Sequence, residues 1–414
     1  MSADRPVVGF DHHSKTYAQD PKGTYSNLHA RCPIAWTEAH GGYWVVSNHD
    51  HVARVARDDD TFSSRHELPN DGKRPAGILQ PPAPYITTPI EMDPPEFAGY
   101  RTLLNPLFAP AAVDRLKPRM REFTDWCLDR FVERGEIDFI EDLANPVPAM
   151  ATMAFLGLPL SDWEMHSWCY HDAVAYPPGT PGWNRAVEGA AASQRKVAEA
   201  IADRRKAPRD DVLTLFTRVQ VNGAPMSDAT ILEICNLIIS GGVDTTTSLI
   251  GHALNHLDEH RDQRRRLIED PELMSPFCEE LLRYYTPTQA LARTATRDVE
   301  VGGQLIRAGE RVLMCWAGAN RDETQFERPH EFVLDRFPNR HVAFGLGVHR
   351  CLGSTFARAE FNIVMQQVLA RMPDYTLLPG ARRYETVGTV NGWARMPARF
   401  TPGAKVGARA PFET

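Results

Sequence analysis

The chain has 414 residues, of which 43% are hydrophobic and 24% are charged, and its formal net charge at pH 7 is −7. These values are ordinary for a globular protein with a large core, and the negative balance disfavours nucleic acid or an anionic membrane as a partner. No apolar run approaches the roughly 18 residues of a membrane span, and the N-terminal residues lack the pattern of a secretory signal. The sequence therefore predicts a cytoplasmic globular protein with no membrane anchor.

The seven cysteines are an odd number, widely scattered, and none belongs to a C-x-x-C pair. This spacing fits neither a disulfide framework nor a zinc site. We expect most of them to be buried thiols, so a cysteine in an unusual setting is informative.

The N-terminal part begins with a β-rich segment at 42–47 and a helical pattern at 50–58. Two proline-rich loops follow, Leu68–Pro89 and Ala175–Trp183, and both carry apolar residues that need a surface to cover. Two interpretations stay open for these loops. They are surface connectors with ordinary packing, or together they form a lid over an apolar pocket.

From about residue 93 to residue 260 the patterns are mostly helical, and one helix is predicted over Asp228–Glu259 with Ser227 as its N-cap. It is apolar on nearly every side, which is typical of a helix that crosses the interior. Its centre carries Gly241, Gly242, Asp244 and Thr245, although glycine costs a helix interior about 1 kcal/mol relative to alanine. A buried carboxylate adds a desolvation cost, so this helix centre needs a functional explanation.

Another helix, a few β segments, an irregular stretch and a final long helix complete the chain, with no internal repeat and no linker. The whole pattern predicts one domain over residues 1–414, mainly α with a small β portion. We expect about 20 residues at the start and about 10 at the end to be loosely attached, as chain termini often are.

A glycine-rich loop surrounds Cys351 in the segment AFGLGVHRCLGSTFARAEF. A thiolate before a helix, with His349 and Arg350 close by, is stabilised by the helix dipole and by positive charge, and a buried thiolate of this kind suits haem iron. The glycines are expected to let the backbone pass close to a flat group. Three alternatives remain: half of a dinucleotide fingerprint, a zinc site, or an ordinary core thiol. Arg350 replaces the third glycine of the fingerprint, and no second ligand pair lies at zinc spacing.

The ten residues FGLGVHRCLG (344–353) resemble the cysteine-ligand loop of the cytochrome P450 haem-thiolate monooxygenases. Further motifs follow the order of that family: MDPPEFAGYR at 92–101, GGVDTT at 241–246 and EELLRY at 279–284. The resemblance spans roughly residues 62–358. It implies a single large helical P450-like domain with haem b buried between the central long helix and the cysteine-ligand loop and helix.

The resemblance also implies roles for individual residues. Cys351 is expected to be the axial ligand of the haem iron, with Phe344, Gly345 and Gly353 lining the cofactor. Arg101, Arg293 and His349 are expected to bind the haem propionates, although Phe97 stands where many relatives have a further histidine. Asp244 and Thr245 are expected to deliver protons, and Glu280, Arg283 and Arg336 to have a structural role. The predicted substrate pocket contains Ile78, Leu79, Gly241, Gln289, Ala290, Leu291 and Val390, with Gln289 and Asn391 as candidates to orient a polar group of the substrate.

A second candidate site is the series His252, His256 and His260, whose spacing brings three imidazoles near one helix face. No glutamate follows His252, so the H-E-x-x-H pattern of a zinc enzyme is absent. Histidines at the surface and at the helix end are therefore the better interpretation.

The expected reaction inserts one atom of O2 into a small hydrophobic organic substrate, a terpenoid, a steroid or an aromatic compound. No complete dinucleotide or flavin fingerprint is visible, so we expect a separate ferredoxin with an NAD(P)H-dependent reductase to supply electrons. Two alternatives remain, a peroxygenase that uses hydrogen peroxide and a haem-based binder or sensor without turnover. The presence of Asp244 and Thr245 argues against both.

Overall fold

The computed structural model describes residues 5–67, 76–83 and 85–412, and the chain forms two compact units. The first unit contains the chain up to Thr102, Leu282–Leu352 and Thr386–Asn391. The second contains Leu103–Leu281, Gly353–Glu385 and the chain from Gly392 onward. Each unit is therefore assembled from segments that are distant in the sequence, and the mainly helical fold with few strands agrees with the predicted fold class.

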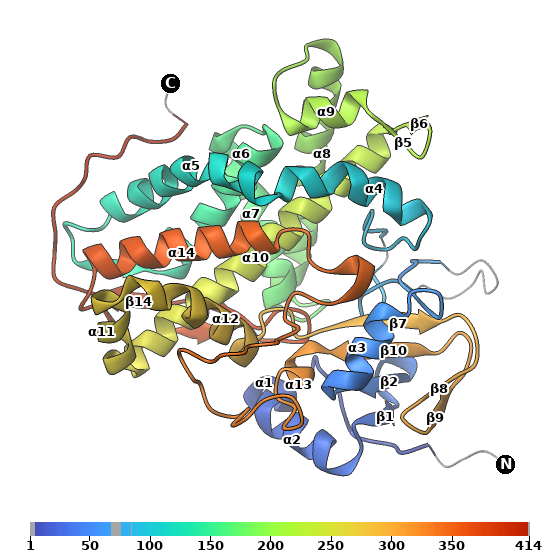
Figure 1. Ribbon diagram of the computed structural model, residues 1–414. Helices are drawn as coiled ribbons and strands as arrows, with labels where there is room; N and C mark the ends of the chain where they lie inside the picture. The colour runs from blue at the N-terminus through green and yellow to red at the C-terminus, as the bar shows by residue number, and fades with distance from the viewer. Residues whose placement is uncertain (1–4, 68–75, 84, 413–414) are drawn as a thin grey trace. The chain divides into compact units, whose positions relative to one another are not determined.

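A five-stranded sheet is the centre of the first unit (Figure 1). Its strands follow the order β1 (Ile34–Thr37), β2 (Tyr43–Val46), β10 (Arg311–Cys315), β7 (Ala290–Ala295) and β3 (Phe62–Ser63). Only the β2–β10 pair is parallel. Val52 and Val55 of α3 (His49–Arg57) share one apolar core with Trp44 and Val312 of the sheet. The sheet thus gives β7, which carries Arg293, a rigid support.

The remaining elements of the first unit surround this sheet. They are α1 (Lys15–Gln19), α2 (Pro21–Arg31), η1 (Ala39–Gly41), α13 (Trp316–Ala319), η6 (Gly347–His349) and the hairpin of β8 (Val299–Val301) and β9 (Gln304–Ile306). The helices α4 (Glu96–Leu104) and α12 (Met274–Tyr285) each contain a boundary between the units. Phe10 and Tyr17 are only 3% and 2% exposed, so the expectation of a loose N-terminus is wrong for the described residues.

Helices dominate the second unit, and α10 (Asp228–Glu259) packs against α6 (Pro146–Leu156), α7 (Trp163–Ala175), α8 (Pro181–Lys206) and α14 (Ser354–Arg371) (Figure 1). The helix α14 also packs against α5 (Pro110–Asp129). The other helical segments are η2 (Asn105–Phe108), η3 (Ile140–Ala144), η4 (Leu160–Asp162), α9 (Val212–Arg218), α11 (Arg261–Glu269) and η5 (Pro271–Leu273). The strands are β4 (Glu136–Asp138), β5 (Gln220–Val221), β6 (Ala224–Pro225), β11 (Thr376–Leu377), β12 (Arg382–Arg383), β13 (Trp393–Arg395) and β14 (Pro397–Arg399).

The long helix α10 has the bounds that the sequence predicts. The Ser227 side chain caps it by accepting a 3.1 Å hydrogen bond from the backbone N–H of Thr230. Buried residues occur on most of its faces, as expected for a helix surrounded by other helices.

The C-terminal segment is held more firmly than predicted. The backbone N–H groups of Val406, Gly407 and Ala408 all donate to the Asp129 carboxylate at the end of α5, at distances of 2.8–3.0 Å. The expectation of a loose C-terminus is therefore wrong up to Ala408. Within the part of the chain that the structure describes, no helix is long and apolar enough to cross a membrane.

Candidate active site

The loop that carries Cys351 is closed by its own backbone. The N–H of Cys351 donates to the carbonyl of Phe344 at 2.8 Å, and the N–H of Arg350 donates to that of Gly347 at 3.1 Å. Cys351 is half-buried and lies three residues before the first residue of α14. The loop thus fixes the position of the Cys351 backbone.

The glycines of this loop have different roles. Gly345 and Gly347 both have positive φ, +67° and +72°, which other residues rarely adopt. A Cβ at Gly347 would clash with the carbonyl oxygen of Ala56 in α3, so this glycine permits packing against α3. The expected approach of the loop backbone to a flat group stays a prediction. A Cβ at Gly345 would meet no atom closer than 3.9 Å, and at Gly353 none within 4 Å, so the backbone at these two residues faces open space.

Three basic residues of the first unit have a lowered pKa: Arg101, Arg293 and His349. Arg293 is 4% exposed, and burial lowers the pKa of its guanidinium to about 10. Burial, together with the charges of Arg293 and Arg101, lowers the pKa of His349 to about 3. The pKa of Arg101 is also lowered by burial, whereas the nearby Cys351 sulfur raises it. Two guanidinium groups thus lie in a partly desolvated region beside Cys351.

This cluster has no ion-paired carboxylate among the described residues, although the charges of Asp93 and Asp59 act on Arg293 from a distance. Among the described residues, none of the three forms an ion pair with a carboxylate, and Arg293 donates only to the carbonyl of Ala292 at 2.9 Å. His349 Nε2 is 3.1 Å from Ser64 Oγ, and its buried Nδ1 has no partner in the described chain. Because buried charges are normally paired, the cluster fits an anionic ligand such as the two propionates of haem.

Phe97 occupies apolar space beside His349. The ring centroids of these two residues are 4.2 Å apart, and the Arg101 guanidinium carbon lies 5.8 Å from the Phe97 ring centroid. Phe97 is 3% exposed. It therefore packs against two of the predicted propionate ligands but offers no hydrogen bond of its own.

The centre of α10 is open on one face. Gly241 is exposed, and a Cβ added there would meet nothing within 4 Å. Thr245 Oγ1 donates a 2.8 Å hydrogen bond to the Gly241 carbonyl. At Gly242, in contrast, a Cβ would lie 3.2 Å from Thr152 Oγ1 of α6, so this second glycine serves helix packing.

Asp244 is a buried acid at the centre of α10. Asp244 is 1% exposed, and its Oδ1 accepts a 2.6 Å hydrogen bond from the Tyr384 hydroxyl. The same oxygen lies 2.9 Å from His171 Nδ1. A role in proton delivery requires an acid that protons can reach from solvent, and the structure shows a carboxylate bound by two partners. The sequence contains no motif that identifies either of them.

The predicted pocket residues are mostly buried. Gln289 is 1% exposed, its Oε1 accepts a 2.8 Å hydrogen bond from the Tyr17 hydroxyl, and its Nε2 donates to the carbonyls of Tyr285 and Thr286. Asn391 Nδ2 also donates to the Tyr285 carbonyl, at 3.1 Å. Both side chains thus bind the protein itself, and the expectation that Gln289 orients a substrate is wrong.

The other predicted pocket residues are apolar. Ile78, Ala290 and Val390 are 6%, 4% and 5% exposed, whereas Leu79 and Leu291 are half-buried. Residues 68–75 and 84 of the first proline-rich loop lie outside the described residues. The lid therefore stays a prediction.

Arg283 is fully buried and binds backbone carbonyls of the irregular segment. Its guanidinium donates to the carbonyls of Asn320, Pro329 and Glu331 at 2.8–3.0 Å. Arg336 donates to the Glu331 carbonyl as well, at 3.4 Å. The neighbouring Glu279 forms an ion pair with Arg358 of α14. Glu280 is also fully buried. These contacts connect distant segments of the chain, as expected for residues with a structural role.

The histidine series of α10 is not a surface feature. His252 and His256 are each 1% exposed, and the Trp393 indole N–H lies 3.3 Å from His252 Nδ1. The interpretation as surface histidines is therefore wrong for these two, whereas His260 is exposed at the helix end. The described residues contain no group of three or more His, Cys, Asp and Glu that is able to hold a metal ion.

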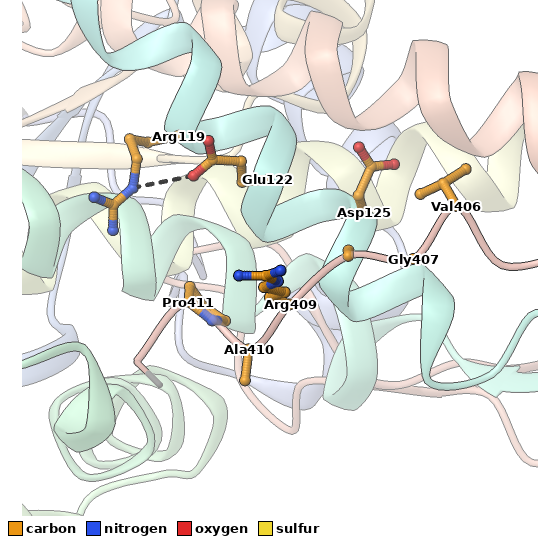
Figure 2. A pocket seen from close by; sticks show the side chains of 9 residues that line it. Arg119, Glu122, Asp125, Val406, Gly407, Arg409, Ala410 and Pro411 are labelled. Atoms are coloured by element: carbon orange, nitrogen blue, oxygen red, sulfur yellow. Dashed lines mark ion pairs between the residues drawn. The ribbon is translucent and has the colours of Figure 1, made fainter. Parts of the chain in front are cut away.

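A pocket of about 610 Å³ lies between α5 and the C-terminal segment, and Figure 2 shows the residues that line it. Arg119 and Glu122 of its wall form a 3.4 Å ion pair. Its lining is charged and contains none of the residues predicted for cofactor or substrate: Arg119, Glu122, Asp125, Val406, Gly407, Ala408, Arg409, Ala410 and Pro411. This pocket does not suit a hydrophobic substrate.

Comparison with known proteins identifies similar chains. The family description "Cytochrome P450" matches residues 187–372. The chain is 31% identical to the putative cytochrome P450 YjiB of Bacillus subtilis, over 87% of this chain and 89% of that protein. It is 32% identical to the steroid C26-monooxygenase of Mycolicibacterium smegmatis, over 92% and 95%. The crystal structure of CYP109E1 from Bacillus megaterium in complex with testosterone has a TM-score of 0.82 and 28% identity, covering 94% of this chain and 99% of that one.

Proposed function

The chain belongs to the cytochrome P450 family, and from this premise we propose that it hydroxylates a steroid or terpenoid with electrons from a ferredoxin. Members of this family are monooxygenases that bind haem b through a cysteine thiolate and use O2, a substrate and a redox partner. The bound haem supplies the activation of O2, and the thiolate ligand favours cleavage of the O–O bond.

The observation that carries the assignment of the site is the cluster of Arg101, Arg293 and His349 beside Cys351. Two guanidinium groups without a carboxylate partner in the described chain fit the propionates of haem. In this proposal Cys351 is the iron ligand, and Asp244 and Thr245 deliver protons. The peroxygenase and sensor alternatives need no such proton-delivery pair.

The substrate class is supported by two kinds of observation. The predicted pocket residues are apolar apart from Gln289, whose amide is engaged by the protein. The relatives include a steroid C26-monooxygenase, and the similar structures contain testosterone or, in CYP268A2 of Mycobacterium marinum, pseudoionone. The latter structure has a TM-score of 0.85 and 28% identity, covering 97% of this chain and 100% of that one.

The test is a screen of steroids, terpenoids and aromatic compounds for a change in the spin state of the purified holoprotein. We expect a shift with a steroid or a terpenoid, followed by NAD(P)H-dependent product formation when a ferredoxin and its reductase are added. A shift with aromatic compounds alone would contradict the substrate class. Turnover that hydrogen peroxide supports and ferredoxin does not would favour the peroxygenase.

A further inference from the structure

Asp244, His171 and Tyr384 form a buried polar cluster within the second unit. They come from α10, α7 and the segment just after β12. His171 Nδ1 lies 2.9 Å from Asp244 Oδ1 and 3.1 Å from the Tyr384 oxygen, and the Tyr384 hydroxyl donates to the same carboxylate oxygen at 2.6 Å. The side chains of His171 and Asp244 are each 2% exposed. Three groups able to carry a proton are thus within hydrogen-bond distance of one another, away from solvent.

The cluster has two polar atoms without a partner. In the part of the chain that the structure describes, neither Asp244 Oδ2 nor His171 Nε2 has a hydrogen bond, although both atoms are buried. Unpaired buried polar atoms are costly and rare, so each one calls for an explanation such as a catalytic role or a bound water. Burial and the Asp244 carboxylate raise the pKa of Tyr384 well above 10, so its hydroxyl keeps its proton and remains a donor.

Other charged groups face the cluster from three elements. Asp172 follows His171 in α7 and is half-exposed, and the pKa of its carboxyl is raised by burial but lowered by His171, Arg185 and Arg382. Arg185 and Arg382 are exposed. The edge of the Trp168 ring packs against His171 at a centroid distance of 5.0 Å. Charged residues that reach solvent thus flank two members of the cluster in the chain: Asp172 next to His171, and Arg383 and Glu385 next to Tyr384.

We propose that Tyr384 and His171 are positioning residues for Asp244 and that His171 returns a proton to Asp244 after each proton delivery. When Asp244 gives up its carboxyl proton, the imidazole of His171, which carries its proton on Nδ1, donates this proton to Oδ1 and accepts one proton from water at Nε2. Exchange of the imidazole between its two neutral tautomers then restores the Nδ1 proton. This inference rests on the proposed role of Asp244 in proton delivery.

The test compares two cluster variants with two matched controls in the holoenzyme. Tyr384→Phe removes the hydroxyl alone, and His171→Asn keeps an N–H donor near Nδ1 but cannot titrate. Tyr375→Phe removes another buried hydroxyl, which donates to the Leu254 carbonyl of α10 at 2.8 Å. His166→Asn removes another buried imidazole of α7, which bonds to Ser193 Oγ at 2.8 Å. Neither control touches Asp244.

We expect all four variants to keep the haem content and the substrate dissociation constant of the parent. The two cluster variants are expected to lower the product formed per NAD(P)H by about 3- to 10-fold. This decrease is smaller than the one usually seen when a general acid itself is removed. His171→Asn also flattens the dependence of this yield on pH, whereas the controls retain the parent profile. Unchanged yield and pH profile in both cluster variants would overturn the inference.

A second readout needs no turnover. In the ferrous–CO form, the ¹⁵N signals of His171, identified by their loss in His171→Asn, are followed against pH. Asp244→Asn and Tyr384→Phe are expected to shift this titration, and an unshifted titration in both would contradict the cluster's role. A parent protein without turnover would refute the proposed function, yet this titration would still decide whether the three groups are coupled.

Discussion

Thr245 Oγ1 donates a 2.8 Å hydrogen bond to the carbonyl oxygen of Gly241, one turn earlier in α10. A side-chain donor to this carbonyl competes with the regular helical bond and distorts a helix locally. This hydrogen bond occurs where the helix lacks a side chain at Gly241 and where a Cβ would meet nothing within 4 Å. The poor helix formers at this point therefore coincide with the open face of the helix.

Replacement of Thr245 tests this relationship. Thr245→Ala is expected to preserve haem and substrate binding but to divert electrons from product to hydrogen peroxide, because the hydroxyl no longer helps to deliver protons. Product and peroxide per NAD(P)H are the measurements. Thr246→Ala is the matched control, since Thr246 is 2% exposed and we assign it to packing. A product yield in Thr245→Ala equal to the parent's would refute the assignment.

The cationic cluster leads to a prediction on haem retention. Arg101→Ala is expected to weaken haem binding by about 10-fold or more, since a charge-assisted hydrogen bond contributes about 1.5–3 kcal/mol. The loss is expected to be smaller when Phe97→His is also present, because the added imidazole supplies another donor. Transfer of haem to apomyoglobin measures the release rate. Equal retention in the parent and in Arg101→Ala would rule this out.

Arg283 is expected to be essential for stability. Arg283→Lys removes the planar guanidinium group that donates to three carbonyls, while Glu280 stays buried. We therefore predict a loss of about 3 kcal/mol in the free energy of unfolding. Urea unfolding followed by circular dichroism measures it. Arg336→Lys serves as the control, and a loss below about 1 kcal/mol is expected for this more exposed residue. The same midpoint for Arg283→Lys and the parent would contradict the role.

His256 leads to a prediction on pH and stability. Burial lowers its pKa to about 4, below the 6.5 of an exposed histidine. The unfolded chain therefore binds the proton more readily, so stability is fully present above pH 6.5 and falls as the pH drops toward 4. The loss attributable to His256 is at most about 3 kcal/mol. His256→Gln, which keeps an N–H group for Gln263, should show a shallower decline in the free energy of unfolding. An identical decline would disprove the assignment.

Local signals explain what the sequence predicts correctly. The bounds of α10 follow from the Ser227 cap and from an apolar pattern within the helix, and the Cys351 loop is a continuous motif. The partners of Asp244 are not predictable in this way, because His171 and Tyr384 are 73 and 140 residues away with no characteristic spacing. The hydrogen bond between Gln289 and Tyr17 also depends on tertiary structure. The sequence shows only that Gln289 is a polar residue in a predicted pocket, and it does not indicate this partner.

The central claim is that Cys351 holds haem through its thiolate in an oxygen-activating enzyme. The most direct test is the absorption spectrum of the reduced, CO-bound protein, compared with that of Cys351→His. The account predicts a strongly red-shifted, thiolate-type Soret band in the parent that is lost in the variant. A histidine-type spectrum in the parent, or purified protein without haem, would contradict it.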